Sequence, residues 1–311
     1  MAERGRRVAV LGLPYFGRRL AGELSGLGWR AHYLPHPGRN LAGWARVAAA
    51  VARAEVVYLI GSRFERWSPQ DLLLRVRRRP VVIHWVGTDV QLAVEAHRRR
   101  RGSTAIAERA VHWCDAPWLV EELRLAGVRA EYVPLPIPLE EGQPPPLPER
   151  FTALLYYPVD AFAREVFDWE TMRRLVEAFP GVRFLLVPSP PETLPGPLPA
   201  NLEARGWAED MEALYREVTV LIRLTTHDGQ SFMAAEAVSR GRYVIWTHPM
   251  PGAVQASGFE AVAAELARLV ERHAAGSLGP NLDGRSAVLE RWGRGAPLRE
   301  IDARLRVLTG G

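Results

Sequence analysis

The sequence predicts an α/β protein made of two doubly wound halves, each with a parallel sheet covered by helices. Short apolar runs rich in β-branched residues alternate with helical stretches, and this alternation stops at a proline-dense segment and then starts again. The runs are apolar almost throughout, which is typical of strands buried on both faces. The length of 311 residues also fits two domains at about 150 residues each.

The first half contains six candidate strands, with helices in the intervals between them. They are Arg7–Leu13, Arg30–Leu34, Glu55–Gly61, Pro80–Gly87, a short strand near Ala116–Val120, and Ala130–Leu135. We therefore expect a first Rossmann-like domain over residues 1–137.

A proline-dense segment follows, and residues 138–150 form most of it. Proline has no N–H to donate and clashes with a helical backbone, so the segment can be neither a helix nor a central strand. We predict that it is an interdomain linker.

The alternation then resumes, and predicts a second Rossmann-like domain over residues 151–286. Its candidate elements are strands at Phe151–Tyr157, Val182–Pro188, a short run ending near Trp207, Val218–Leu224 and Tyr243–Thr247, and helices at Asp168–Phe179 and Phe259–Ala274. Residues 287–311, with a clear helical stretch at Arg299–Leu308, are expected to be helices able to cross back to the first domain.

The composition excludes several chemistries. All 40 basic residues are arginine, so no lysine is present for a Schiff base, a pyridoxal-phosphate anchor, a P-loop or a protein-kinase site. A single cysteine, Cys114, rules out an intramolecular disulfide. No acidic motif or His/Cys cluster has metal-ligand spacing, and no stretch of about 18 apolar residues occurs. We expect a cytoplasmic protein without a bound metal.

The net charge of +5 and the isoelectric point near 9.8 favour an anionic ligand or an anionic membrane surface. Two arginine-rich runs, Leu72–Pro80 and His97–Arg101, lie at expected helix ends. They are interpreted as a solvated basic face, with peripheral contact to lipid headgroups at the inner face of the membrane as the alternative. Nucleic acid is not expected, because no aromatic residues interleave these runs.

The loop after the first strand carries glycines but not the dinucleotide fingerprint Gly-x-Gly-x-x-Gly. Gly12 and Gly17 flank a turn into a helix, and Arg18 follows. Backbone N–H groups and this arginine could face an anion, such as a phosphate or a charged acceptor. A tight turn with solvated arginines explains the same residues equally well.

The stretch from Val218 to Thr247 is the most informative. An apolar strand ends at Arg223, a polar loop carries Asp228, Gly229 and Gln230, and Ser231 can cap the next helix. Ligands of doubly wound sheets bind at the carboxyl ends of strands, and a helix N-terminus beside an arginine suits a diphosphate. Glu236, about a turn and a half into the helix, could accept hydrogen bonds from ligand hydroxyls.

These residues resemble the donor site of retaining GT-B glycosyltransferases of the GT4 type. The chain has Asp228-x7-Glu236 where that family has Glu-x7-Glu, followed by a Gly-x-x-Val-Ile strand at Gly241–Ile245. The stretches Gly206–Leu224 and Asp115–Pro138 are similar to the same family. The resemblance implies two Rossmann-like domains in a GT-B fold and metal-independent transfer of a sugar from a nucleoside-diphosphate sugar to a hydroxyl of a glycan, lipid or small molecule.

The resemblance also implies roles for individual residues. Glu236 would hold the ribose, Asp228 with Gly229 the donor sugar, and Gln230 and Ser231 the donor. His84 matches a family histidine that ends a strand and hydrogen-bonds the transferred sugar; the alternative is a histidine satisfied by the loop backbone. No cofactor is implied beyond the sugar nucleotide.

Two departures from the family concern the donor site. The family usually holds the phosphates with an arginine and a lysine, and here Arg164, with Arg223 second, is the candidate replacement for the lysine. The first acidic residue of the pair is shortened to Asp228. A non-catalytic GT-B scaffold or partner subunit, and a GT-B sugar-nucleotide epimerase, therefore remain alternatives to a transferase.

Overall fold

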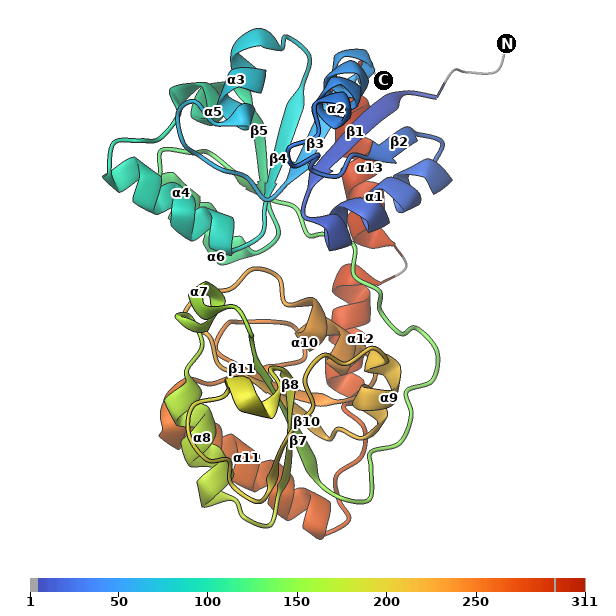
Figure 1. Ribbon diagram of the computed structural model, residues 1–311. Coiled ribbons are helices and arrows are strands. Elements are labelled where there is room, and N and C mark those ends of the chain that lie inside the picture. Colours follow the sequence, from blue (N-terminus) through green and yellow to red (C-terminus); the bar gives the residue numbers. More distant parts are fainter. Residues whose placement is uncertain (1–4, 294, 311) are drawn as a thin grey trace. The chain divides into compact units, whose positions relative to one another are not determined.

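The computed structural model describes residues 5–293 and 295–310, and it divides into two compact units. The first unit comprises Met1–Pro136 and Gly295–Gly311, and the second comprises Ile137–Arg294. Each unit has a six-stranded parallel sheet flanked by helices (Figure 1). The predicted fold class, two Rossmann-like parallel-sheet halves, is confirmed.

In the first unit the strand order is β2-β1-β3-β4-β5-β6. The strands are β1 (Arg7–Gly12), β2 (Arg30–Tyr33), β3 (Val56–Ile60), β4 (Val81–Trp85), β5 (Val111–Cys114) and β6 (Glu131–Tyr132). Every residue of β3 and β4 is buried, as expected for central strands covered on both faces.

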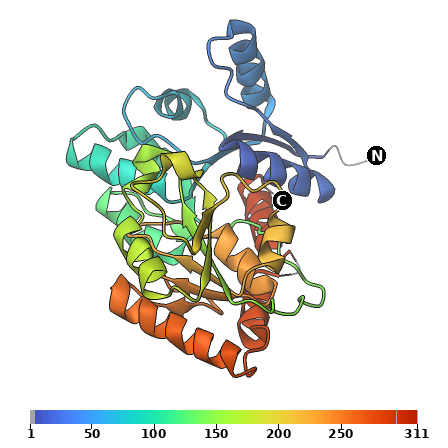
Figure 2. The same ribbon diagram turned by 60° about the horizontal axis from the view of Figure 1, so that its bottom comes forward.

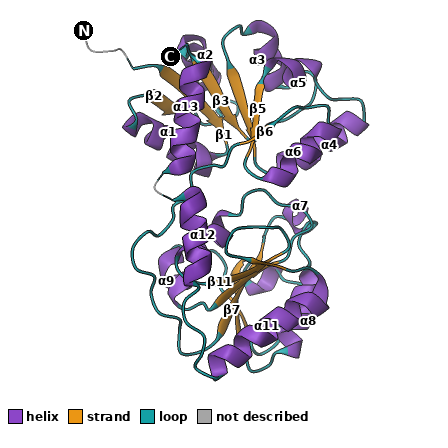
Figure 3. Cartoon of the chain, turned by 180° about the vertical axis from the view of Figure 1, so that it is seen from behind, coloured by secondary structure: helices purple, strands orange, loops and turns teal. Residues whose placement is uncertain are grey.

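The helices of this unit connect the strands and add one element from the end of the chain. They are α1 (Pro14–Gly26), α2 (Leu41–Arg53), α3 (Pro69–Val76), α4 (Thr88–Arg98), α5 (Thr104–Arg109), α6 (Pro117–Leu125) and α13 (Ala296–Leu308). Viewed from behind, α1 and α13 lie side by side (Figure 3).

One element of the first unit differs from the sequence expectation. The expected strand near Ala116–Val120 is wrong, because α6 occupies that stretch and β5 lies just before it. Pro117 is the reason: its fixed φ suits the first turn of a helix, where its missing N–H costs nothing. The strand is instead formed by Val111–Cys114, which pairs in parallel with β4.

In the second unit the strand order is β12-β11-β10-β7-β8-β9. The strands are β7 (Thr152–Tyr157), β8 (Arg183–Pro188), β9 (Leu202–Ala204), β10 (Val220–Arg223), β11 (Tyr243–Trp246) and β12 (Val254–Gln255). The helices are α7 (Ala161–Arg164), α8 (Trp169–Ala178), the short 3-10 helix η1 (Pro191–Thr193), α9 (Met211–Arg216), α10 (Phe232–Ser239), α11 (Gly258–Ala274) and α12 (Leu282–Trp292).

The proline-dense segment, residues 138–150, has no helix or strand and belongs to the second unit. Side chains of the second unit hold its carbonyl oxygens: Arg242, which is fully buried, donates from Nη1 to Pro146 at 2.9 Å, and His273 Nε2 lies 3.0 Å from the oxygen of Pro148. Proline carbonyls remain good acceptors although the residue has no N–H. The segment is thus a strap bonded along the second unit.

The last two helices belong to different units. Helix α12 lies in the second unit, whereas α13 lies in the first. Helix α13 is fixed there by its buried Ile301 and Leu305 and by Asp302, which accepts a 2.6 Å hydrogen bond from Trp29 Nε1. The chain therefore returns to its first unit with this one helix.

Each sheet has one point where the strand order changes direction. In the first sheet β2 and β3 lie on opposite sides of β1, and in the second β8 and β10 lie on opposite sides of β7. Loops after the two strands at such a point leave the sheet in different directions and open a crevice at the carboxyl ends of those strands. Ligand sites are therefore expected after β1 and β3, and after β7 and β10.

Candidate functional site

Arg223 is the last residue of β10 and lies at the crevice of the second sheet. Its guanidinium stacks on two aromatic rings, 4.9 Å from the centroid of Tyr156 and 5.3 Å from that of Phe167. Its Nε donates to Asp228 Oδ2 at 2.5 Å, while its two terminal nitrogens have no hydrogen-bond partner among the described residues. The rings and the carboxylate orient the guanidinium, and its terminal N–H groups remain available for an anion.

The Arg223–Asp228 ion pair is largely removed from water, with side chains 11% and 15% exposed. Burial alone would lower the pKa of Arg223, but the Asp228 carboxylate outweighs it, so the pKa is raised and the guanidinium stays charged. Asp228 also accepts a hydrogen bond from the Gly229 N–H at 3.1 Å. The structure thus brings together two predicted site residues as partners of each other.

The N-terminus of α10 follows directly. Ser231 is its N-cap and is buried, and its hydroxyl accepts from the Ala234 N–H at 3.2 Å. The Met233 N–H has no partner among the residues that the structure describes, as expected for a first-turn donor. Gln230, just before the cap, is also buried. The Met233 N–H and the positive end of the helix dipole make this turn suitable for a phosphate.

Glu236 lies further along α10 and is half-buried. Its Oε2 accepts a 3.0 Å hydrogen bond from the hydroxyl of Tyr215, which comes from α9. The Arg240 guanidinium stacks 5.0 Å above the ring of Tyr215. Tyr215 therefore fixes the Glu236 carboxylate in one orientation, as required of a group that positions a ligand hydroxyl.

Arg164, the predicted replacement for a family lysine, is used by the protein itself. It donates to the carbonyl oxygens of Pro158 (2.7 Å) and Thr193 (2.8 Å) and to the Ser189 hydroxyl (3.2 Å), and it stacks on Tyr157 at 4.9 Å. A guanidinium has five N–H donors, so these bonds occupy most of them. Arg164 thus connects the loop after β7 with the loop after β8. Of the two candidate arginines, Arg223 is the one with free donors.

His84 lies in the core and not at a ligand-accessible strand end. It is 0% exposed within β4, all of whose residues are buried, and its Nδ1 is 2.6 Å from the Tyr58 hydroxyl. Burial lowers the pKa of His84 to about 3, with only partial opposition from the backbone of Val133, so the ring is neutral. Its Nε2 is buried and has no hydrogen-bond partner among the described residues, so the expected contact of His84 with a donor sugar stays a prediction.

The glycine loop of the first unit is a packing feature in the structure. Gly12 has φ +104°, and a Cβ there would lie 1.9 Å from the Ile60 oxygen. At Gly17 a Cβ would lie 2.6 Å from the ring of Tyr33, and Arg18 is exposed, 5.8 Å from the same ring. The two glycines permit close approach of β3 and of Tyr33, which accounts for them without an anion.

Three aromatic residues of the site were not singled out from the sequence. Tyr156 and Phe167 support Arg223, and Tyr215 supports Glu236. For Tyr215 a signal existed, because it is the tyrosine of the Leu-Tyr pair within Gly206–Leu224. For Tyr156 and Phe167 none did, because an aromatic residue in an apolar strand or a loop looks like any core residue.

Within residues 5–293 and 295–310, no three His, Cys, Asp or Glu side chains are grouped to hold a metal ion. Over the same residues, every helix is too short or too polar to cross a bilayer. Two arginines of the run Leu72–Pro80 form hydrogen bonds within the first unit. Arg77 donates to the carbonyl oxygens of Val51 and Ala54, and Arg79 donates to that of Ala54. These bonds satisfy the last carbonyls of α2.

Comparison with known proteins gives a clear answer for the fold. No protein-family model matches the sequence, and no curated protein matches it. Among solved structures, the chain is similar to a sucrose-phosphate synthase from Thermosynechococcus elongatus at a TM-score of 0.74 and 15% identity, covering 98% of this chain and 99% of that one.

Two further solved structures are similar over nearly their whole length. A glycosyltransferase from Rickettsia africae matches at a TM-score of 0.68 and 11% identity, over 98% of this chain and 99% of that one. Anabaena HepE in complex with UDP and glucose matches at a TM-score of 0.65 and 11% identity, over 97% of this chain and 99% of that one. With the two six-stranded sheets, these matches define the class: the chain has the GT-B glycosyltransferase fold.

Proposed function

We propose that this protein is a glycosyltransferase that moves a sugar from a nucleoside-diphosphate sugar to an acceptor hydroxyl. The observation that carries the proposal is Arg223, a largely buried guanidinium with free terminal donors beside the N-terminus of α10, at the crevice of the second sheet. Both features attract negative charge, and together they suit a diphosphate. The structural similarity to HepE in complex with UDP and glucose makes UDP the first nucleotide to test.

In the proposed reaction, the bond between the anomeric carbon and the diphosphate oxygen breaks, and its electron pair goes to the diphosphate. Arg223 and the first turn of α10 stabilise that charge, which is the main catalytic contribution of such a site. The acceptor oxygen bonds to the anomeric carbon, and its proton passes to a diphosphate oxygen. Glu236, oriented by Tyr215, would accept hydrogen bonds from the ribose hydroxyls.

We further propose that the anomeric configuration is retained and that no metal takes part. Asp228 pairs with Arg223 and Glu236 is bonded to Tyr215, so neither carboxylate is placed as a free nucleophile. Departure of the diphosphate and entry of the acceptor on the same face require none. The cationic side chain and the helix N-terminus supply the positive charge that a metal would otherwise provide.

A second candidate is a non-catalytic nucleotide-binding protein. One observation favours it: the carboxylate predicted to hold the donor sugar, Asp228, already neutralises the guanidinium of Arg223. Such a protein would bind a nucleoside diphosphate without breaking a sugar nucleotide.

The experiment has two stages. A thermal-shift panel of UDP, GDP, ADP and dTDP should give one stabilising nucleotide, worth about 2.7 kcal/mol at 100 times its Kd. Incubation with the matching sugar nucleotides and a mixture of sugar, lipid and aromatic acceptors should then release the diphosphate. Binding without any release supports the second candidate, and no shift with any nucleotide contradicts both.

A further inference from the structure

The first unit contains a cavity of about 490 Å³ between α2 and α3. It lies at the other crevice of the molecule, because Gly12 ends β1 and Gly61 directly follows β3, and both line it. A cavity of this volume has the size of small-molecule sites in other proteins. It is built entirely from the first unit and shares no residue with the site around Arg223.

The cavity exists because α2 does not pack down on the sheet. Gly43 is the only buried residue of α2, and the helix stands out from its unit (Figure 2). The face of α2 that points toward the sheet is nonetheless apolar, with Trp44, Val47 and Val51 lining the space. An apolar helix face that covers a cavity, and not a packed core, leaves area that a ligand can bury.

The walls include two aromatic rings and two proline rings. Trp44 is fixed by a 3.0 Å hydrogen bond from its Nε1 to the Gly38 oxygen, and its indole is 5.2 Å from the ring of His36 in an edge-on arrangement. Pro35 and Pro37 contribute two more rings. The indole and the imidazole favour an aromatic ligand, because stacked and edge-on contacts between aromatic rings stabilise by more than the buried area alone, while the two proline rings add rigid apolar surface.

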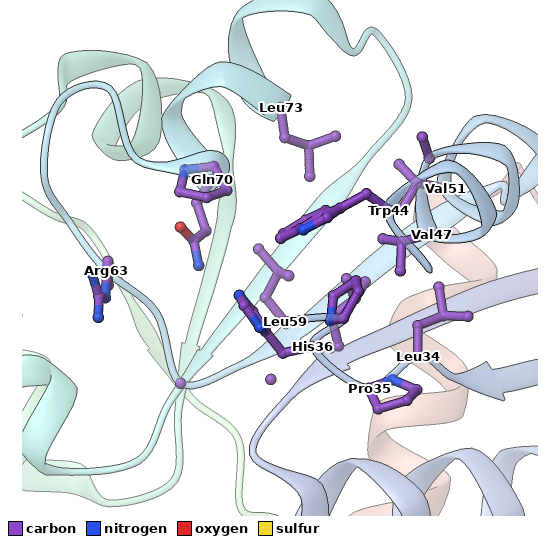
Figure 4. Close-up of a pocket in the computed structure, with 16 residues that line it drawn as sticks. Leu34, Pro35, His36, Trp44, Val47, Val51, Leu59, Arg63, Gln70 and Leu73 are labelled. Atoms are coloured by element: carbon purple, nitrogen blue, oxygen red, sulfur yellow. The ribbon is translucent and has the colours of Figure 1, made fainter. Parts of the chain in front are cut away.

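The polar groups of the lining are few, and one lacks a partner. The Gln70 side chain points into the cavity (Figure 4), and its amide has no hydrogen bond among the described residues; Oε1 is buried in this state. Leaving a buried carbonyl oxygen without a donor costs about 1–3 kcal/mol, so a ligand that donates to it is favoured. The lining contains no acidic side chain, while Arg63 stands at one edge.

We propose that this cavity binds the aromatic ring system of the acceptor, with an acceptor hydroxyl hydrogen-bonded to Gln70. The proposal rests on the proposed glycosyl transfer and narrows its acceptor from any hydroxyl compound to a compact, ring-bearing one. The apolar walls bury the rings, Trp44 stacks on them, and Gln70 distinguishes a hydroxyl from an ether.

The test uses 7-hydroxycoumarin as the probe, with 7-methoxycoumarin as its non-donating match and geraniol as an aliphatic match. Titration of the full chain should give saturable one-site binding, strongest for 7-hydroxycoumarin. The variant Ala48→Trp fills the cavity and should weaken that binding more than tenfold. The control Ala45→Trp, on the same helix but not in the lining, should leave it unchanged.

A second variant keeps the test independent of how well a tryptophan is accommodated. Gln70→Leu should reduce the preference for the hydroxyl over the methyl ether from about fivefold to none, since one hydrogen bond is worth about 1 kcal/mol. Equal binding in Ala48→Trp and wild type, or tighter binding of geraniol than of the coumarin, overturns the proposal. UDP binding is measured in parallel. If UDP binds and 7-hydroxycoumarin does not, the acceptor-cavity proposal fails and the transferase proposal stands. If 7-hydroxycoumarin binds and UDP does not, the cavity is a ligand site but the transferase proposal is contradicted.

Discussion

At the scale of single residues, the candidate site depends on how one guanidinium is oriented. Two neighbouring aromatic rings contact the Arg223 guanidinium and a carboxylate accepts from its Nε, and together they fix the plane of its remaining donors. A flexible surface arginine loses side-chain conformational entropy when it binds an anion, and this loss weakens binding. The Arg223 side chain is already held in one orientation by the fold, so less entropy is lost on binding.

The pairing of Arg223 with Asp228 leads to a prediction with opposite effects on binding and turnover. In Asp228→Asn the guanidinium loses its neutralising partner, so affinity for free UDP should rise by about threefold to tenfold. Release of UDP from its sugar nucleotide should fall, because the amide no longer accepts hydrogen bonds from the sugar as a carboxylate does. Calorimetric titration and a turnover assay measure the two quantities. Weaker UDP binding in Asp228→Asn would show that Asp228 is needed to position Arg223.

A second residue-scale prediction concerns Asp71 in the first unit, a completely buried carboxylate. Burial alone would raise the pKa of Asp71, but hydrogen bonds from Arg75, Ser103 and the Trp67 N–H outweigh it and lower the pKa to about 2. The ionised form therefore stabilises the fold above the ordinary carboxyl pKa, and this contribution is lost as the pH falls toward 2.

We expect Asp71→Asn to lower stability at pH 7 by about 1–3 kcal/mol, because partners are left unsatisfied. The difference in Tm between wild type and variant should shrink between pH 4 and pH 3. Asp283→Asn, at an exposed aspartate, is the matched control. A Tm difference that does not change with pH would contradict the assigned role of the charge.

At the scale of elements, the strap of residues 138–150 is held mainly by arginines. Besides the bond from Arg242, the Arg285 side chain donates from Nε to the Ser239 oxygen (2.9 Å) and from Nη2 to the Gly142 oxygen (2.5 Å). The strap has no helical or strand hydrogen bonds of its own, so its order depends on such contacts. Since α10 ends at Ser239, Arg285 also joins the strap to the helix of the candidate site.

We predict that Arg285→Ala increases amide hydrogen exchange in residues 139–145 at least tenfold, while exchange in β7 and β10 stays unchanged. Loss of two or three hydrogen bonds from an exposed segment frees it locally without unfolding the core. Mass spectrometry of exchanged peptides measures this directly, with Arg268→Ala on α11 as the control. Unchanged exchange in the strap would mean that other contacts hold it.

The elements also show how far the sequence alone could lead. Periodicity and β-branched runs located ten of the twelve strands closely, because buried parallel strands are apolar throughout. These patterns gave the wrong element for Ala116–Val120, where the apolar residues belong to a helix face, and they missed β12, which has only two residues. In the candidate site, Arg223, Asp228 and Ser231 are neighbours in sequence and were found together. The Tyr156 and Phe167 rings come from other elements, so no local pattern could assign them.

The surroundings of His84 and Arg164 also could not be derived from a local pattern. The resemblance assigns His84 to a sugar contact near the end of its strand, whereas in the structure its side chain is fully buried and contacts Tyr58. Arg164 was placed correctly after β7, yet its donors are occupied by carbonyl oxygens from a loop about 30 residues away. The hydrogen-bond partners of a side chain depend on the tertiary structure, which a local sequence pattern does not determine.

At the scale of the whole molecule, the chain forms two units with separate cores and separate crevices. The helix α13 belongs to the first unit although it follows the second in sequence, so the chain passes between the units twice. Each crevice is built from one unit only: the Arg223 site from the second, and the apolar cavity from the first. Ligand binding at each can therefore be tested separately.

This separation predicts the effect of a core substitution in α13. Ile301 is 0% exposed, and Ile301→Ala should destabilise the first unit by about 2–5 kcal/mol through lost burial and a cavity. Below the unfolding temperature, the Kd for UDP should stay within twofold of wild type. Thermal unfolding and calorimetric titration give the two values, and a parallel loss of UDP affinity would show that the units are energetically coupled.

The measurement that tests the account most directly is calorimetric titration of UDP into the wild-type chain and into Arg223→Gln, at one salt concentration. We predict saturable one-site binding to the wild type and a loss of at least tenfold in Arg223→Gln, because the glutamine cannot supply a charged, forked donor. Equal affinity of the two proteins for UDP would contradict the placement of the donor diphosphate at Arg223.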